Sequence, residues 1–193
     1  VAGGALADAF IVDSIQGGAG TSANMNMNEV LANRAGEILG DPLGSYQEIH
    51  PNDHVNMSQS TNDVIPSAGK LTTLDLLGSL KASLTALRYA LNDKAVEFDD
   101  VLKMGRTQLE DAVPMRLGQT FSGYSSMVQR CEDRIARVKE EMLAMNLGGT
   151  AIGSAINVPP YYLRAIVPNL SKLTGYPLHQ AHDLFDATER SEE

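Results

Sequence analysis

The chain has 193 residues, and 24 acidic against 15 basic residues give it a formal net charge of −9. This length fits one large domain or two small ones, and 43% hydrophobic residues are enough for a packed core, which excludes a disordered chain. The acidic balance excludes a nucleic-acid-binding role, because no cluster of Lys and Arg is present to displace phosphate counterions. One cysteine, Cys131, excludes an intrachain disulfide and fits a reducing compartment.

No apolar run reaches the length that spans a bilayer, and no basic start leads into an apolar stretch. We therefore expect a soluble, cytoplasmic protein without a membrane partner. The chain starts at Val1 and stops at Glu193 without an obvious cap or tail, so we also expect a piece of something longer.

The first fifty residues are mixed in pattern. Residues 10–15 are apolar and predict either a strand or an irregular buried segment. A helix is predicted over about 24–39, where Gly40 and then Pro42 end it. Residues 41–58 have little apolar periodicity and predict a loop.

The middle of the chain has a clear helical pattern. After Asn62 and Asp63 a helix is predicted to about Phe98, with leucines at 77, 80, 84, 87 and 91 in a 3, 4, 3, 4 spacing. A second helix is predicted from about Ala112 to Leu147, closed by two glycines, with a similar apolar row that starts at Phe121. A third, shorter helix is predicted over 161–174.

Helices of more than 30 residues, about 50 Å long, need partners that supply an opposing apolar row. This chain has only two of them, and the shorter third helix cannot cover both. We therefore predict a mostly α fold in which a long-helix bundle is incomplete in this chain, and an oligomer that completes it.

Each predicted helix start carries small hydroxyl or amide side chains. These starts are Gly20-Thr21-Ser22, Ser58-Gln59-Ser60-Thr61-Asn62 and Gly105-Arg106-Thr107-Gln108. Several helix amino ends that converge would bind a carboxylate without a metal and could stabilise negative charge during a reaction. Ordinary N-capping explains many such clusters, but the segment 58–63 has more polar groups than one cap uses.

Other candidate sites are weaker. His50 and His54 flank Pro51, which prevents a regular helix, and no third ligand is evident, so we expect no metal and no cofactor. Cys131 lies in the apolar row of the second long helix, where a free cysteine usually packs as a small apolar residue. Arg106 beside a helix start has the simpler role of tying down a loop or a carboxylate.

Four long segments resemble the aspartase/fumarase superfamily. They are GGAGTSANMNMNEVLANRA (17–35), HPNDHVNMSQSTND (50–63), MGRTQLEDAVPMRLGQ (104–119) and NLGGTAIG (146–153). The resemblance implies a homotetramer around a bundle of long helices and active sites built by three different chains. It also implies that residues 1–58 end an N-terminal domain and that residues 59–193 begin the central helical domain.

The resemblance further implies which residues bind a dicarboxylate substrate: Thr21, Ser60, Thr61, Asn62, Thr107 and Gln108, with Ser22 beside them. His50, Asn52 and Asp53 resemble a secondary anion site. In this family the catalytic base is a serine on a loop with a G-S-S-x-M-P signature, and that motif is missing from the 193 residues. The catalytic residues therefore stay unknown, and we expect this polypeptide alone to be inactive.

The reaction that the resemblance implies is the reversible removal of ammonia from L-aspartate to give fumarate, through an aci-carboxylate intermediate. Two residues depart from the family pattern: Met57 replaces a common lysine, and Gln108 replaces the histidine of fumarases and many aspartases. Glutamine can donate a hydrogen bond but cannot shuttle protons, which favours the ammonia-lyase branch. A fumarase that acts on malate and a non-catalytic helical scaffold are the alternatives.

Overall fold

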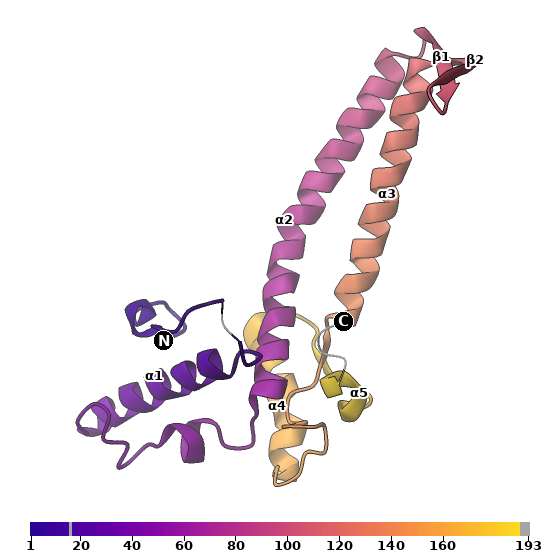
Figure 1. The fold of residues 1–193 in the computed structure, drawn as a ribbon. Helices are drawn as coiled ribbons and strands as arrows, with labels where there is room; N and C mark the ends of the chain where they lie inside the picture. Colours follow the sequence, from indigo (N-terminus) through magenta and orange to yellow (C-terminus); the bar gives the residue numbers. More distant parts are fainter. Residues whose placement is uncertain (16, 190–193) are drawn as a thin grey trace. The chain divides into compact units, whose positions relative to one another are not determined.

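The computed structural model describes residues 1–15 and 17–189, and most of its secondary structure is α-helical (Figure 1). It consists of two units, which are described separately. The first contains the described residues of 1–70 and 143–193, and the second contains residues 71–142. The prediction of a mostly α fold with long helices is confirmed. Among the described helices, none is long and apolar enough to cross a bilayer.

Figure 1 labels the principal helices and strands along the chain. In chain order all the elements are η1 (Ala7–Ala9), α1 (Thr21–Leu39), the π-helical turn η2 (Pro51–Val55), α2 (Thr61–Glu97), β1 (Leu102–Thr107), β2 (Glu110–Arg116), α3 (Leu117–Glu141), β3 (Ala144–Met145), α4 (Pro160–Thr174), β4 (His179–Gln180) and α5 (Leu184–Glu189). The predicted helices at the positions of α1, α2 and α4 are confirmed to within three residues at either end.

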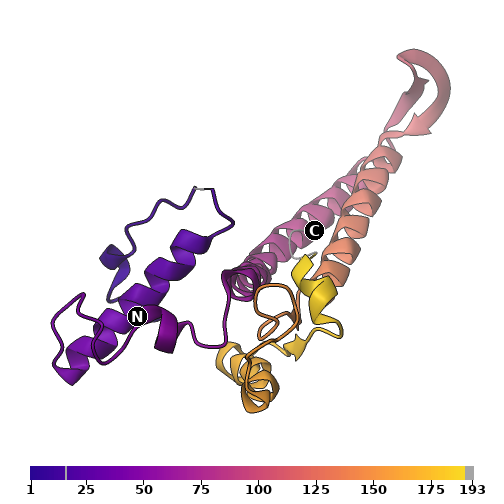
Figure 2. The ribbon, with the colours of Figure 1, turned by 60° about the horizontal axis from the view of Figure 1, so that its bottom comes forward.

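In the first unit, α1 lies beside η2 (Figures 1 and 2) and buries asparagines as well as apolar residues. Asn26 accepts hydrogen bonds from the backbone of Ile11 and Val12 and donates one to Ala9 O, which fixes the segment before the helix. That segment is irregular and exposed: the side chain of Ile11 is 85% exposed and that of Ile15 is 90% exposed. Both a strand and a buried segment at residues 10–15 are therefore wrong predictions, since the segment has no regular structure and its apolar side chains are exposed.

The carboxyl-terminal part of the first unit packs around a short parallel strand pair. β3 and β4 pair in parallel. Met145 of β3 and Val167 of α4 are fully buried. His179 N donates to Leu143 O and Ala181 N donates to Met145 O. Because these carbonyls are used by β4, the chain is extended at 144–145 and the second long helix ends earlier than predicted, at Glu141.

In the second unit, α2 and α3 lie side by side and the hairpin β1–β2 joins them (Figure 1). A Cβ at Gly118 would lie 2.3 Å from Ala95 O, so the two helices approach closely only because this residue is glycine. The rings of Phe98 and Phe121 stack with centroids 5.5 Å apart. Between the helices, the buried Glu132 accepts hydrogen bonds from Thr85 and Arg88, which together lower the pKa of its carboxyl.

The apolar rows of both helices are only partly covered by this pairing. Leu77, Leu84 and Leu91 are half-buried, whereas Leu80 is 46% exposed and Leu87 48% exposed. On α3, Val128 is buried and Tyr124 is half-exposed. Helix pairing in this chain therefore leaves part of each apolar row exposed, as expected for helices whose 3.5-residue spacing calls for further partners.

The prediction of helix from Ala112 is wrong, because Glu110–Arg116 is the strand β2 and α3 begins at Leu117. Pro114 disfavours helical backbone at Val113. The hairpin turn was missed because its two central residues, Gln108 and Leu109, are not the usual Asn-Gly. Both have positive φ, 48° and 69°, as in a type I′ turn.

We predict that Leu109→Gly stabilises the hairpin. Leu109 is 95% exposed and loses no packing, while glycine adopts positive φ without steric strain, so the free energy of unfolding should rise by about 1 kcal/mol. Urea denaturation measures the change. The same substitution in a helix, Leu173→Gly, serves as the control and should lower the free energy of unfolding by about 1 kcal/mol. Equal losses in both variants would contradict the strained turn.

Candidate functional site

The amino ends of α1 and α2 meet in the first unit. Gly20 precedes α1 with a φ of 85°, and a Cβ built on it would lie 3.0 Å from Cγ2 of Ile65 in the second turn of α2. Ala19 and Thr61 line the same cavity. Two of the three polar segments that the sequence singles out are therefore neighbours within one chain.

Ser60 acts as the N-cap of α2. Its Oγ accepts a hydrogen bond from Asn62 N at 3.2 Å, and Asp63 Oδ1 accepts one from Ser60 N at 2.9 Å. The bond from Ser60 N to Asp63 is the one that the third helical residue makes in a capping box, with aspartate in the place of the usual glutamate, whereas the serine hydroxyl caps Asn62 N. The capping role therefore holds for Ser60 and Asp63, but it leaves the side chains of Thr61 and Asn62 for other contacts.

Those two side chains tie α2 to distant segments. Thr61 Oγ1 accepts a hydrogen bond from Asn24 Nδ2 of α1 at 3.2 Å, and Asn24 also donates to Asn56 Oδ1. Asn62 Nδ2 donates to Ala151 O at 2.8 Å. The surplus polar groups of residues 58–63 thus join the start of α2 both to α1 and to the loop at 146–153.

Pro66 gives α2 an unusual requirement. Proline has no N–H, so the carbonyl of Asn62, four residues earlier, receives no helical hydrogen bond at this position. The fully buried Asn146 supplies the missing donor, since its Nδ2 lies 3.0 Å from Asn62 O. Its Oδ1 in turn accepts from Ser67 Oγ at 3.4 Å.

Asp63 is fully buried and joins the same two segments. While one carboxylate oxygen binds Ser60 N, the other accepts from Gly148 N at 3.1 Å and Thr150 N at 3.0 Å. Burial raises the pKa of the Asp63 carboxyl, and hydrogen bonds from backbone N–H groups oppose this rise. Burial also raises the pKa of Tyr162, and the negative charge of Asp63 adds to that increase.

A pocket of about 440 Å³, here called the Ser60 pocket, lies where these segments meet. None of its lining residues is charged, and most are polar: Asn24, Met25, Asn56, Ser58, Gln59, Ser60, Thr61, Thr150, Ala151, Ile156 and Asn157. The oxygens of Ser60 and Thr61 already accept hydrogen bonds from Asn62 N and Asn24 Nδ2. Each hydroxyl can therefore donate its own proton to a ligand, which suits an anion.

A second cavity of about 440 Å³ shares Thr61 with the Ser60 pocket and is also lined by Asn62 and Ala19. Thr21 lines neither cavity. Its hydroxyl is exposed and donates to Gly18 O at 2.9 Å. Within the first unit the structure thus places Ser60 and Thr61 in one pocket, Thr61 and Asn62 in the other, and Thr21 near both at the start of α1.

Thr107 and Gln108 belong to the second unit. They lie at the tip of the β1–β2 hairpin and not at a helix start, so the prediction of a third helix amino end is wrong. Arg106 Nε pairs with Asp111 Oδ1 at 2.9 Å across the hairpin, which confirms its simpler role of binding a carboxylate. Because Thr107 and Gln108 do not lie at a helix start, neither can use a helix dipole to bind an anion in this chain.

His50 and His54 cap their own turn. His50 Nδ1 accepts from the backbone N–H groups of Asn52 and Asp53, and His54 Nδ1 accepts from His50 N. Within residues 1–15 and 17–189, no group of three His, Cys, Asp or Glu side chains is placed to hold a metal ion. The role of His50, Asn52 and Asp53 as a secondary anion site stays a prediction.

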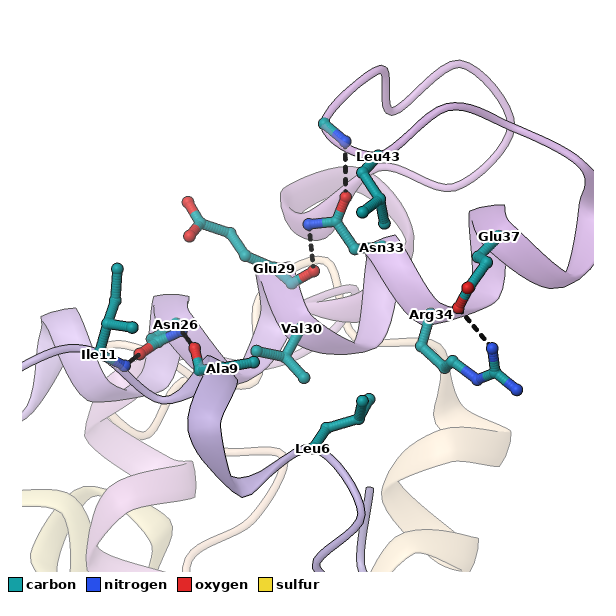
Figure 3. Close-up of a pocket in the computed structure, with 11 residues that line it drawn as sticks. Leu6, Ala9, Ile11, Asn26, Glu29, Val30, Asn33, Arg34, Glu37 and Leu43 are labelled. Atoms are coloured by element: carbon teal, nitrogen blue, oxygen red, sulfur yellow. Dashed lines mark hydrogen bonds and ion pairs between the residues drawn. The ribbon is translucent and has the colours of Figure 1, made fainter.

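Another cavity, of about 610 Å³, lies between the amino-terminal segment, α1 and the loop at 43–44 (Figure 3). Leu6, Val30 and Leu43 supply apolar lining. The asparagines on its wall are committed to backbone groups: Asn26 to residues 9–12, and Asn33 to Gly44 N and Glu29 O. Arg34 pairs with Glu37 on the surface, so this cavity presents little chemistry for a reaction.

Sequence reasoning missed several lining residues of the Ser60 pocket, namely Asn24, Asn56, Thr150 and Asn157. The segment NLGGTAIG carried a signal for Thr150, since it is one of the four segments that support the family resemblance. Nothing in the local pattern indicated that Asn24 and Asn56 contact the same helix start.

Comparison with known proteins places the chain in a family. The sequence profile of a family described as Lyase matches residues 1–193, and the chain belongs to this lyase family. Aspartate ammonia-lyase from Bacillus subtilis is 49% identical over 185 residues, which are 96% of this chain and 39% of that protein. Aspartate ammonia-lyase from Helicobacter pylori strain 26695 is 53% identical over 182 residues, 94% of this chain and 39% of the relative.

Solved structures show the same likeness. A fumarate lyase:delta crystallin from Brucella melitensis, bound to cobalt, superposes with a TM-score of 0.87 at 47% identity, covering 96% of this chain and 40% of that one. A class II fumarase from Schistosoma mansoni superposes with a TM-score of 0.73 at 35% identity, covering 88% of this chain and 39% of the fumarase chain. The chain therefore spans about two-fifths of the length of the proteins that it matches.

We predict that Gly20→Ala destabilises the chain more than Gly40→Ala. Both glycines have positive φ, so both variants should lose about 1 kcal/mol of unfolding free energy. Only at position 20 does the new methyl group meet a neighbour, Ile65, and this overpacking should add about 1 kcal/mol. Urea denaturation of both variants measures the difference. Equal losses would show that α1 and α2 do not meet at this point.

Proposed function

We propose that these residues form part of a lyase that reversibly converts L-aspartate into fumarate and ammonia. The Ser60 pocket carries this proposal, because two hydroxyls at the amino end of a 37-residue helix line an uncharged cavity. Helix amino ends and hydroxyl donors favour carboxylates. The similarity to aspartate ammonia-lyases over 96% of this chain supports the same substrate class.

In the proposed site, Ser60 and Thr61 donate hydrogen bonds to the substrate and Thr21 and Asn62 lie beside them. Thr107 and Gln108 act at a site of another copy of the chain. Because no described residue lining the Ser60 pocket is charged, a cation from another segment or subunit must offset the two negative charges of the ligand. We therefore propose a homo-oligomer, a tetramer as in the family that the sequence resembles.

The proposed reaction begins when a base removes a proton from the carbon next to the β-carboxylate of aspartate. The electron pair moves into that carboxylate, which becomes a doubly negative aci-carboxylate. The C–N bond then breaks, the double bond of fumarate forms, and the amine leaves as ammonia. Donors that bind the aci-carboxylate more strongly than the ground-state carboxylate lower the barrier. The base is a serine outside these 193 residues.

Fumarase is the second candidate, because the Schistosoma mansoni class II fumarase matches 88% of the chain. The chemistry would be the same, with water leaving malate in place of ammonia leaving aspartate. Gln108 favours the ammonia-lyase, since glutamine cannot carry a proton to or from a leaving group. A non-catalytic scaffold would need only the helices and leaves the hydroxyls of the Ser60 pocket without a purpose.

A segment exchange tests the proposal. We predict that Bacillus subtilis aspartate ammonia-lyase in which these 193 residues replace the 185-residue segment that they match produces fumarate from aspartate, followed by ultraviolet absorbance. Fumarate from malate but not from aspartate would favour the fumarase. Activity with neither substrate, in a chimera that assembles normally, would contradict both.

In the same chimera, Thr61→Val should reduce kcat/KM for aspartate by about tenfold to a hundredfold, the value of one hydrogen bond to a charged group. Ser60→Ala should cause a similar reduction and also lower the unfolding free energy by about 1 kcal/mol, because it removes the N-cap. Ser79→Ala is the matched control, since this exposed serine bonds only to its own helix. A scaffold predicts no effect on activity from any of the three.

The 193 residues alone should not produce fumarate at a measurable rate, because they contain no G-S-S-x-M-P segment to supply the base. The purified polypeptide, assayed with aspartate beside the chimera, checks this expectation. Turnover at an enzyme-like rate would place the base within this chain.

A further inference from the structure

We propose that Asp63 is a positioning residue of the dicarboxylate site, which clasps the start of α2 to the 148–150 loop so that both walls of the Ser60 pocket face one ligand. This inference rests on the proposed function and goes beyond it, because Asp63 lines neither cavity. It acts through the residues that it holds.

The clasp is built from three backbone hydrogen bonds to one buried carboxylate. Oδ1 accepts from Ser60 N at 2.9 Å, and Oδ2 accepts from Gly148 N at 3.1 Å and Thr150 N at 3.0 Å. The side chain is completely buried, so water cannot substitute for these donors. Hydrogen bonds to a charged acceptor are about twice as strong as neutral ones.

The two clasped segments both contribute to the lining of one pocket. Ser60 and Thr61 belong to the α2 side, whereas Thr150 and Ala151 belong to the loop side. The remaining ties between the two segments come from side-chain amides: Asn62 Nδ2 to Ala151 O and Asn146 Nδ2 to Asn62 O. Among these ties, the carboxylate of Asp63 is the charged group that binds backbone N–H groups of both segments.

The donors require a carboxylate at this position. Three N–H groups converge on two oxygens, and an asparagine would place its own NH2 group against at least one of them. Asp63→Asn should therefore keep most of the packing but release one wall. Asp63→Ser should leave the N-cap hydroxyl of Ser60 in place but is too short to reach the loop.

The test uses the segment-exchange chimera described above, with Asp63→Asn, Asp63→Ser and the control Asp93→Asn, which removes an exposed charge from the same helix. Three measurements are made: the oligomer size, amide hydrogen exchange of peptides covering 58–62 and 147–151, and kcat and KM for aspartate. In both Asp63 variants we expect an assembled oligomer, faster exchange at 147–151, and a KM raised by about tenfold with a smaller change in kcat. The control should match the parent chimera.

Each other outcome is decisive. Faster exchange with an unchanged KM would overturn the positioning role, because a merely structural contact behaves in that way. Unchanged exchange in Asp63→Ser would overturn the clasp itself. If Asp63→Asn does not assemble, Asp63→Ser supplies both measurements. A parent chimera that is inactive contradicts the proposed function instead, and the exchange rates then still decide whether the clasp exists.

Discussion

The first unit depends on how the amino end of α2 satisfies its backbone. Pro66 withholds a donor from the carbonyl of Asn62, and Asn146 supplies it from a loop more than 80 positions away. Asp63 accepts from the same loop and from Ser60 N. Asp63, Asn146 and Gly148 are buried and Ser60 and Thr150 are half-buried, so leaving one of their polar groups unpaired costs about 1–3 kcal/mol. These bonds tie the helix start to the loop on the two sides of the pocket.

This division of work explains why the segment 58–63 is so polar. Asp63 and the backbone hold the helix start against the loop, whereas the hydroxyls of Ser60 and Thr61 remain at the pocket with one hydrogen bond each already accepted. A hydroxyl held in this way is oriented to donate, which is the property that a developing negative charge requires. Stability and the proposed binding of an anion thus use neighbouring atoms of the same six residues.

Helical spacing was sufficient to predict α1, α2 and α4, since each has its own apolar period and a glycine or a cap at an end. The hairpin could not be predicted in the same way, because Gln108 and Leu109 adopt positive φ without the glycine that normally indicates such a turn. At the site, Ser60 and Thr61 were predictable from the excess of hydroxyls. Asn24 and the 148–150 loop were not, since they reach α2 across 37 and 87 positions of the chain.

Two features of the chain would both be completed by other subunits: the exposed leucines of α2 and the uncharged lining of the Ser60 pocket. The leucines of α2 remain about half exposed at every second position of their row, and apolar faces of this kind are normally covered by other helices. The Ser60 pocket has hydroxyl donors but no charged lining residue in the described part of the chain, and a ligand with two negative charges needs a cation there. Helices from other subunits would bury the leucines and could carry that cation to the helix end. In the proposed oligomer one association would meet both needs, and binding of the ligand would then depend on assembly.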